Sequence, residues 1–169
     1  IEIFTPTVVY LIAPGFVEDV NKFDLAVELT RITFPFLFFV SLSSFFSGIL
    51  NTNNKFAAAA AAPIILNVFL ILSLIISYYF DFNFEINLSY AVSLAGFFQL
   101  LFLAFFTKKY YKPSINFKIR INSKVKFFFN KLLPSIFSSG VTQINIFVGT
   151  IIASFESGAV SYLYYADRI

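Results

Sequence analysis

The sequence predicts an all-α membrane protein, a polytopic bundle of transmembrane helices. The chain is 59% hydrophobic and 21% aromatic, and only 12% of its residues are charged, whereas soluble domains usually have about a quarter of their residues charged. Its mean hydropathy is +0.82. A soluble chain of 169 residues could not bury this much apolar surface in one core, so lipid must cover a large part of it.

Uncharged runs long enough to cross a bilayer occur along the whole chain. A spanning helix needs roughly 20 mainly apolar residues. The runs show no alternation of period two, which favours helices over strands. We expect the chain to be truncated at both ends, with two partial membrane helices at about 1–12 and 158–169. The four full membrane helices are expected at about 32–50, 56–80, 88–106 and 132–155.

Three prolines lie near the starts of these runs, at Pro35, Pro63 and Pro134. Proline is best tolerated in a first helical turn, where its missing N–H is not needed. Deeper in a helix it produces a kink. Both placements are compatible with the sequence.

The charges gather between the apolar runs, and their sign alternates. Residues 107–131 contain eight Lys and Arg and no acid, and residues 51–55 contain a single lysine. The acids lie mainly at 14–31, 81–87 and 156–158. The positive-inside rule places 107–131 in the cytoplasm. We therefore expect the turn at 51–55 inside as well, and the three acidic connections outside.

The basic segment 107–131 has two interpretations. The first is a topology signal that is also attracted to anionic lipid. The second is direct contact with a phosphorylated substrate head group. Nucleic acid is not an expected partner, because these cations flank a helix end in a membrane context.

Asp167 and Arg168 are the most informative charges, because ionisable residues inside a membrane are rare and usually functional. They lie about ten residues into the last segment, near the middle of the bilayer if that helix continues. Gly158, Ser161, Tyr165 and Arg168 recur at helical spacing and share one face. Arg168 either holds an anionic substrate group in a cavity or forms a structural ion pair with a distant carboxylate. The residues alone leave both open.

A second helical face is made of small and polar residues. It belongs to the run at 132–155 and consists of Ser135, Ser138, Thr142, Asn145 and Gly149. Such a face either lines water or packs tightly on another helix with hydrogen bonds. Both uses remain possible from the sequence.

Enzyme signatures are missing from the sequence. It contains no Cys and no His, which excludes thiol catalysis, disulfides and the usual nitrogen and sulfur metal sites. It also has no nucleophile elbow and no phosphate-binding glycine loop. We expect no metal and no cofactor. A membrane enzyme whose site lies in another part of a longer chain stays an alternative.

Short motifs follow one another in a fixed order along essentially the whole chain. They are Ala13–Phe16, Arg31–Pro35, Gly48–Thr52 with Phe56, Ala62–Pro63, Leu66–Asn67, Val141–Asn145, Ile152–Ser154, Ser157–Ser161 and Tyr164–Arg168. In that order and spacing they resemble the MurJ/MviN family of lipid II flippases, part of the multidrug/oligosaccharidyl-lipid/polysaccharide exporter superfamily. Single pieces such as Ala-Pro-Gly-Phe are weak signals. The ordered set, ending on Tyr-Tyr-Ala-Asp-Arg, is a strong one.

The resemblance implies a transporter with two helical lobes around a central cavity. Residues 1–106 then form the latter part of the first lobe, 107–131 the cytoplasmic connection and 132–169 the start of the second lobe. It implies that the protein is a flippase rather than an enzyme, in the bacterial inner membrane. Such a protein moves lipid II, a peptidoglycan precursor, to the outer face by alternating access.

The resemblance also implies roles for particular residues. Arg168 matches a family arginine in the eighth membrane helix that faces the cavity and is required for flipping. Asp167 matches the adjacent acid. The implied partners are lipid II and membrane lipids, with no identifiable coupling ion. We expect substrate binding by Arg168, Asp167 and Ser161, and a cavity lining that includes Ser138, Thr142, Asn145 and Tyr165.

Other functions remain compatible with the sequence. A polysaccharide-lipid flippase or a drug exporter of the same superfamily shares the architecture. A membrane-embedded enzyme acting on glycan lipids needs a catalytic motif outside these residues. A scaffold without transport activity does not need Arg168 in the middle of the membrane.

Overall fold

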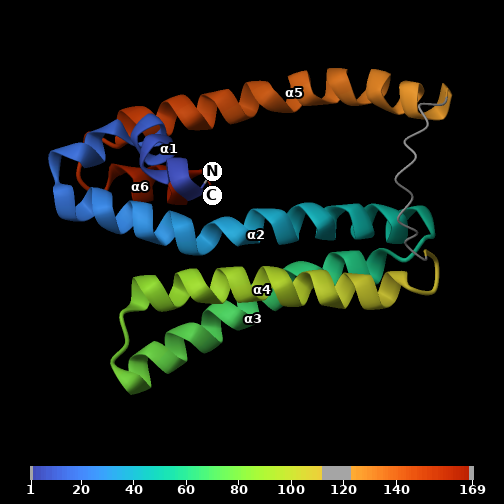
Figure 1. Ribbon diagram of the computed structural model, residues 1–169, viewed down its shortest axis with the longest axis horizontal. Helices are drawn as coiled ribbons and strands as arrows, with labels where there is room; N and C mark the ends of the chain where they lie inside the picture. The colour runs from blue at the N-terminus through green and yellow to red at the C-terminus, as the bar shows by residue number, and fades with distance from the viewer. Residues whose placement is uncertain (1, 112–122, 168–169) are drawn as a thin grey trace. The chain divides into compact units, whose positions relative to one another are not determined.

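The described part of the chain is almost entirely helical. The computed structural model describes residues 2–111 and 123–167, without the side chains of Glu2, Lys124 and Ser138. All of its secondary-structure elements are helices (Figure 1), which confirms the predicted all-α class. In chain order they are the 3-10 helix η1 (Glu2–Phe4), α1 (Thr5–Ile12), the 3-10 helix η2 (Pro14–Glu18), α2 (Val20–Thr52), α3 (Phe56–Phe80), α4 (Phe84–Thr107), α5 (Ser123–Ala153) and α6 (Ala159–Ala166).

Four of these helices are long and apolar enough to cross a membrane. They are α2, α3, α4 and the part of α5 at Val125–Ala153. Much of their apolar surface faces outward. Phe38, Ile71 and Leu101, for example, are each about half exposed or more. A side chain of this kind is stable in contact with lipid rather than water, so the chain is part of a polytopic membrane protein.

Three helices begin earlier than their apolar runs. α2 starts at Val20 rather than near residue 32, α4 at Phe84 rather than near residue 88, and α5 at Ser123 rather than near residue 132. Polar and charged residues lower the hydropathy of a segment but do not stop a helix. At the start of α2, the Asp19 carboxylate accepts hydrogen bonds from the backbone N–H groups of Asn21 and Lys22, at 3.1 and 3.3 Å. Bonds of this kind stabilise a helix start, so most of the expected connection at 14–31 is helical.

All three prolines lie inside helices, in α2, α3 and α5. None of the three prolines therefore lies in the first turn of its helix. Proline removes a backbone bond and strains the carbonyls of the preceding turn. One such carbonyl, that of Ile32 in the turn before Pro35, accepts a hydrogen bond from the Ser93 hydroxyl of α4. In membranes, neighbouring hydroxyl side chains often satisfy backbone groups near a proline in this way.

The chain divides into two compact units. The first combines Ile3–Asp24 with Ser114–Ile169, and the second is Leu25–Pro113. In the second unit, buried Leu50, Ala62 and Leu103 bring together the ends of α2, α3 and α4. The predicted division into two lobes around residues 107–131 remains a prediction, and residues 112–122 of that segment lie outside the described part of the chain.

Candidate functional site

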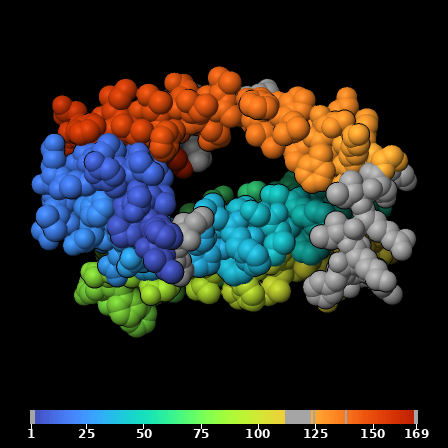
Figure 2. Space-filling model, turned by 45° about the horizontal axis from the view of Figure 1, so that its top comes forward, coloured from blue at the N-terminus to red at the C-terminus, as the bar shows by residue number. Residues whose placement is uncertain are grey.

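The first unit is held together by contact between η2 and the end of α5. The backbone N–H of Gly15 donates a hydrogen bond of 3.0 Å to the Ser154 hydroxyl, across 139 residues of sequence. Ser154 is only 2% exposed, and its hydroxyl donates in turn to the Ile151 carbonyl at 2.7 Å. Figure 2 shows the blue N-terminal segment directly against the orange-red C-terminal end of α5. This contact holds Ser154, at the start of the turn that leads from α5 to α6, against η2.

A tight turn then reverses the chain between α5 and α6. Gly158 precedes the first residue of α6 and has a φ of 78°, in the left-handed region that glycine occupies without a steric penalty. The Ala159 N–H bonds back to the Glu156 carbonyl at 3.3 Å. Gly158 therefore allows α6 to fold back along the last turns of α5.

Gly158→Ala is expected to destabilise this turn by about 1–2 kcal/mol, because an L-residue with a side chain is strained in the left-handed region. Thermal unfolding of the purified full-length protein measures the effect. Gly48→Ala is the matched control, since a Cβ at Gly48 meets nothing within 4 Å. Replacing glycine by alanine inside a helix should stabilise it by up to about 1 kcal/mol. Equal shifts for the two variants would contradict the role of the turn.

A cavity of about 220 Å³ lies between α5 and α6. From α5 it is lined by Asn145 and Gly149, two members of the predicted small and polar face, from α6 by Leu163, and just after α6 by Asp167. A Cβ on Gly149 would lie 3.3 Å from a Leu163 methyl carbon, so the absence of a side chain at Gly149 lets the two helices approach. The structure thus brings Asp167 close to Asn145 and Gly149, at the C-terminal end of the predicted face of α5.

The other predicted site residues lie elsewhere or outside the described part of the chain. Thr142 and Ser161 are exposed, and Tyr165 is 68% exposed. None of these three lines the cavity. Arg168 and the side chain of Ser138 lie outside the described residues. The roles given to these residues remain predictions.

The sequence reasoning missed the face of α6 that meets α5. The lining residues Val160, Leu163, Tyr164 and Asp167 follow a helical spacing of three, one and three. That spacing can be read from the sequence, and it leads to Asp167. The predicted face is the neighbouring one through Ser161 and Tyr165, because it ends on Arg168.

The cavity between α5 and α6 offers a carboxylate and an amide. The Asp167 backbone N–H donates to the Leu163 carbonyl at 3.0 Å, and Asp167, which is exposed, lines the cavity. The Thr150 hydroxyl donates to the Ile146 carbonyl at 2.8 Å. A carboxylate repels phosphate and attracts cations and hydrogen-bond donors. The described part of this cavity therefore suits a positively charged or donor group.

The chain is similar over its whole length to a described family. The family model "Lipid II flippase MurJ" matches residues 1–169. A protein from Rickettsia prowazekii (strain Madrid E) named "Probable lipid II flippase MurJ" is 42% identical over 99% of this chain and 33% of its own length. A protein of the same name from Rhizobium tropici is 39% identical over 95% of this chain and 31% of its own length.

A third protein of that name, from Buchnera aphidicola subsp. Schizaphis graminum (strain Sg), is 37% identical over 99% of this chain and 33% of its own length. The chain thus spans about a third of the length of the curated relatives that it matches. A family model that covers all 169 residues leaves no segment of the chain outside the similarity. The chain belongs to the MurJ family of lipid II flippases.

Proposed function

We propose that this chain is part of a flippase that moves lipid II from the inner to the outer face of the bacterial cytoplasmic membrane. The observation that carries the proposal is the match of the family model to residues 1–169. The four helices of membrane-spanning length and composition agree with a transporter. The proposed activity is that of a whole flippase. The matched relatives are about three times as long as this chain.

The proposed orientation places the basic segment 107–131 in the cytoplasm. The acidic connections at 14–31, 81–87 and 156–158 then lie outside, and the turn at 51–55 lies inside. The distribution of Lys and Arg supports this orientation through the positive-inside rule. The lengths of α3 and α4, which run between a basic and an acidic connection, are compatible with single crossings.

The proposed substrate contact is Arg168, with Asp167 and Ser161 beside it. Lipid II carries a pyrophosphate, and arginine binds phosphate oxygens through two parallel charge-assisted hydrogen bonds. Asp167, at the α5–α6 cavity, is well placed to orient a cation or a donor. A carboxylate beside the arginine also weakens its hold on the anion, which favours release after flipping.

The proposed mechanism is alternating access. In this mechanism the two predicted lobes, 1–106 and 132–169, rock against each other, and the lipid II head group reaches the outer face.

Complementation tests the proposed function. The full-length gene is expressed in bacteria depleted of their own lipid II flippase. Growth should be rescued, and lipid II should become accessible at the outer face. A protein that inserts into the membrane at normal levels without rescue would contradict the lipid II assignment. It would favour a polysaccharide-lipid or drug exporter of the same architecture.

A further inference from the structure

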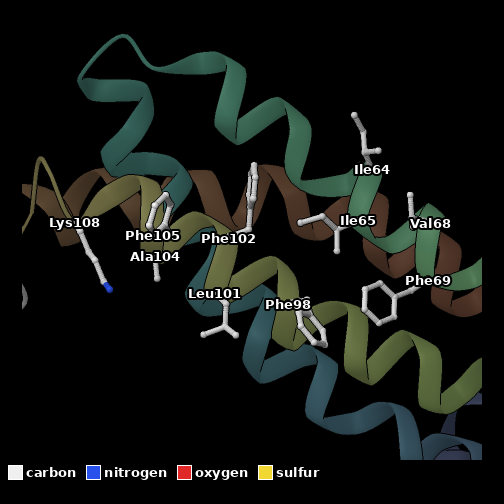
Figure 3. A pocket seen from close by; sticks show the side chains of 10 residues that line it. All are labelled: Ile64, Ile65, Val68, Phe69, Phe98, Leu101, Phe102, Ala104, Phe105 and Lys108. Atoms are coloured by element: carbon white, nitrogen blue, oxygen red, sulfur yellow. The ribbon is translucent and has the colours of Figure 1, made fainter.

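A long apolar groove runs between α3 and α4 in the second unit. Its volume is about 710 Å³, within the range of about 300–1,000 Å³ that is usual for small-molecule sites. Figure 3 shows Ile65 and Phe69 from α3 facing Phe98 and Phe102 from α4. The rings of Phe69 and Phe98 are stacked at 5.1 Å between centroids. The only charged lining residue in this groove is Lys108, at the end of the described α4.

A second hollow adjoins the groove at that end. Its volume is about 490 Å³, and Lys55, Lys108 and Lys109 all line it. Phe105 and Lys108 line both spaces. The groove therefore leads from an apolar interior, past Phe105, to a cluster of three lysines. We call this cluster the lysine end of the groove.

At the lysine end, the backbone of Lys55 and Lys108 forms hydrogen-bonded turns. The Lys55 N–H donates to the Leu50 carbonyl at 2.9 Å, and the Lys108 N–H donates to the Ala104 carbonyl at 3.1 Å. Beneath these turns, Leu50 and Leu103 are at most 1% exposed. A buried cluster thus fixes the backbone from which the lysines extend.

No acidic residue lies near the lysine end in the sequence. There is no acid between Glu28 and Asp81, or between Glu85 and Glu156. Asp81 and Glu85 lie at the opposite ends of α3 and α4, about 35 Å away at 1.5 Å per helical residue. The acids at the far end cannot neutralise the lysines over such a distance, because the Debye length is about 8 Å at physiological salt.

From this arrangement we propose that the groove between α3 and α4 binds one anionic bilayer phospholipid. One acyl chain lies in the apolar groove beside Phe98 and Phe102, and the phosphate is held at the lysine end by Lys55, Lys108 and Lys109. Charge complementarity selects the occupant. A zwitterionic lipid carries its own cation, which the three lysines repel, and a purely apolar ligand leaves them without a counter-charge.

The site is distinct from the proposed substrate contact and independent of it. It lies wholly within the second unit, whereas Asp167 and Arg168 belong to the first. An anion bound here bridges the turn at 51–55 and the end of α4, and so stabilises the packing of α2, α3 and α4. The expected consequence is a membrane protein whose stability increases with the content of anionic lipid.

Fluorescence quenching tests the site directly, because the chain contains no Trp. A single tryptophan is introduced by Phe105→Trp in the full-length protein, with any tryptophan elsewhere replaced by phenylalanine. The protein is reconstituted in phosphatidylcholine vesicles with a small fraction of acyl-brominated phosphatidylglycerol or acyl-brominated phosphatidylcholine. Since each surface lysine favours an anionic lipid by about 1 kcal/mol, the relative binding constant for the phosphatidylglycerol is expected to be about tenfold higher or more.

A matched control places the tryptophan at the acidic end by Tyr78→Trp. Tyr78 is 74% exposed and should be quenched equally by both brominated lipids. Replacing Lys55, Lys108 and Lys109 together by glutamine should abolish the preference at position 105. Salt at about 1 M, where the Debye length is roughly 3 Å, should reduce the preference without any substitution.

Two results would overturn the proposal. The first is equal quenching by the two brominated lipids at position 105 in the protein with all three lysines. The second is displacement of brominated phosphatidylglycerol by equimolar undecaprenyl phosphate but not by unlabelled phosphatidylglycerol, which would assign the groove to an isoprenyl chain. Neither result depends on flipping, so the test is separable from that of the proposed function.

Discussion

Arg168→Ala in the full-length protein is expected to abolish lipid II flipping while leaving membrane insertion intact. Each hydrogen bond to a charged group contributes about 1.5–3 kcal/mol. Loss of a two-bond contact to the pyrophosphate should therefore weaken head-group binding by about 100-fold or more. Rescue of growth in flippase-depleted cells measures the effect. The amount of protein in the membrane fraction shows whether insertion is preserved.

Two further variants test the chemistry assigned to Arg168. Arg168→Lys should rescue only partly, because lysine keeps the charge but loses the planar, two-pronged geometry. Lys118→Ala is the matched control, since it removes one cation from the basic segment 107–131 and should leave rescue unchanged. Normal growth with Arg168→Ala would exclude a role in flipping. It would favour the structural ion pair.

Gly15→Ala is expected to destabilise the protein more than any other glycine-to-alanine change considered. A Cβ at Gly15 would lie 2.6 Å from the Phe155 backbone nitrogen and would also overlap the Ser154 carbonyl group. These are backbone atoms at the end of a helix, so they cannot turn away as a flexible side chain can. Overpacking of this kind costs about 1–3 kcal/mol or more. Thermal unfolding of the purified protein is the measurement.

The control for this prediction is Gly140→Ala in α5. A Cβ at Gly140 meets nothing within 4 Å, so the change should be neutral or slightly stabilising in a helix. Ser154→Ala tests the hydrogen bond separately. It leaves the buried Gly15 N–H without its acceptor, at a cost of about 1–3 kcal/mol. A Gly15→Ala protein as stable as the Gly140→Ala protein would show that η2 and α5 are not packed in this way.

The membrane helices could be predicted because their signal is local. The run at 56–80 is uncharged and apolar, and α3 has those bounds. Backbone groups in lipid must bond within their own segment, so an apolar run of sufficient length determines a helix without reference to any other part of the chain. The helix starts were harder to predict. At Val20 and Ser123 the helix extends into polar sequence, where hydropathy no longer distinguishes a helix from a loop.

The candidate site could be predicted only in part. Helical spacing identified the small and polar face of α5, two of whose members, Asn145 and Gly149, line the α5–α6 cavity. Asp167 was identified because a charge is rare inside a membrane segment. Spacing also placed Ser161 and Tyr165 on one face of the last helix. It could not show which face of that helix meets α5.

The sequence by itself determined the helical class, the membrane segments and the uneven distribution of charge, because each depends on neighbours along one helix. Only the tertiary structure decided which distant residues meet. Gly15 and Ser154 are 139 residues apart, and their contact depends on an approach of two backbones that no local pattern encodes. The groove leading to Lys55 and Lys108 likewise exists only where α3 and α4 pack together. Packing between helices in lipid is decided by close fit and by a few hydrogen bonds, and these arise only once the helices are in contact.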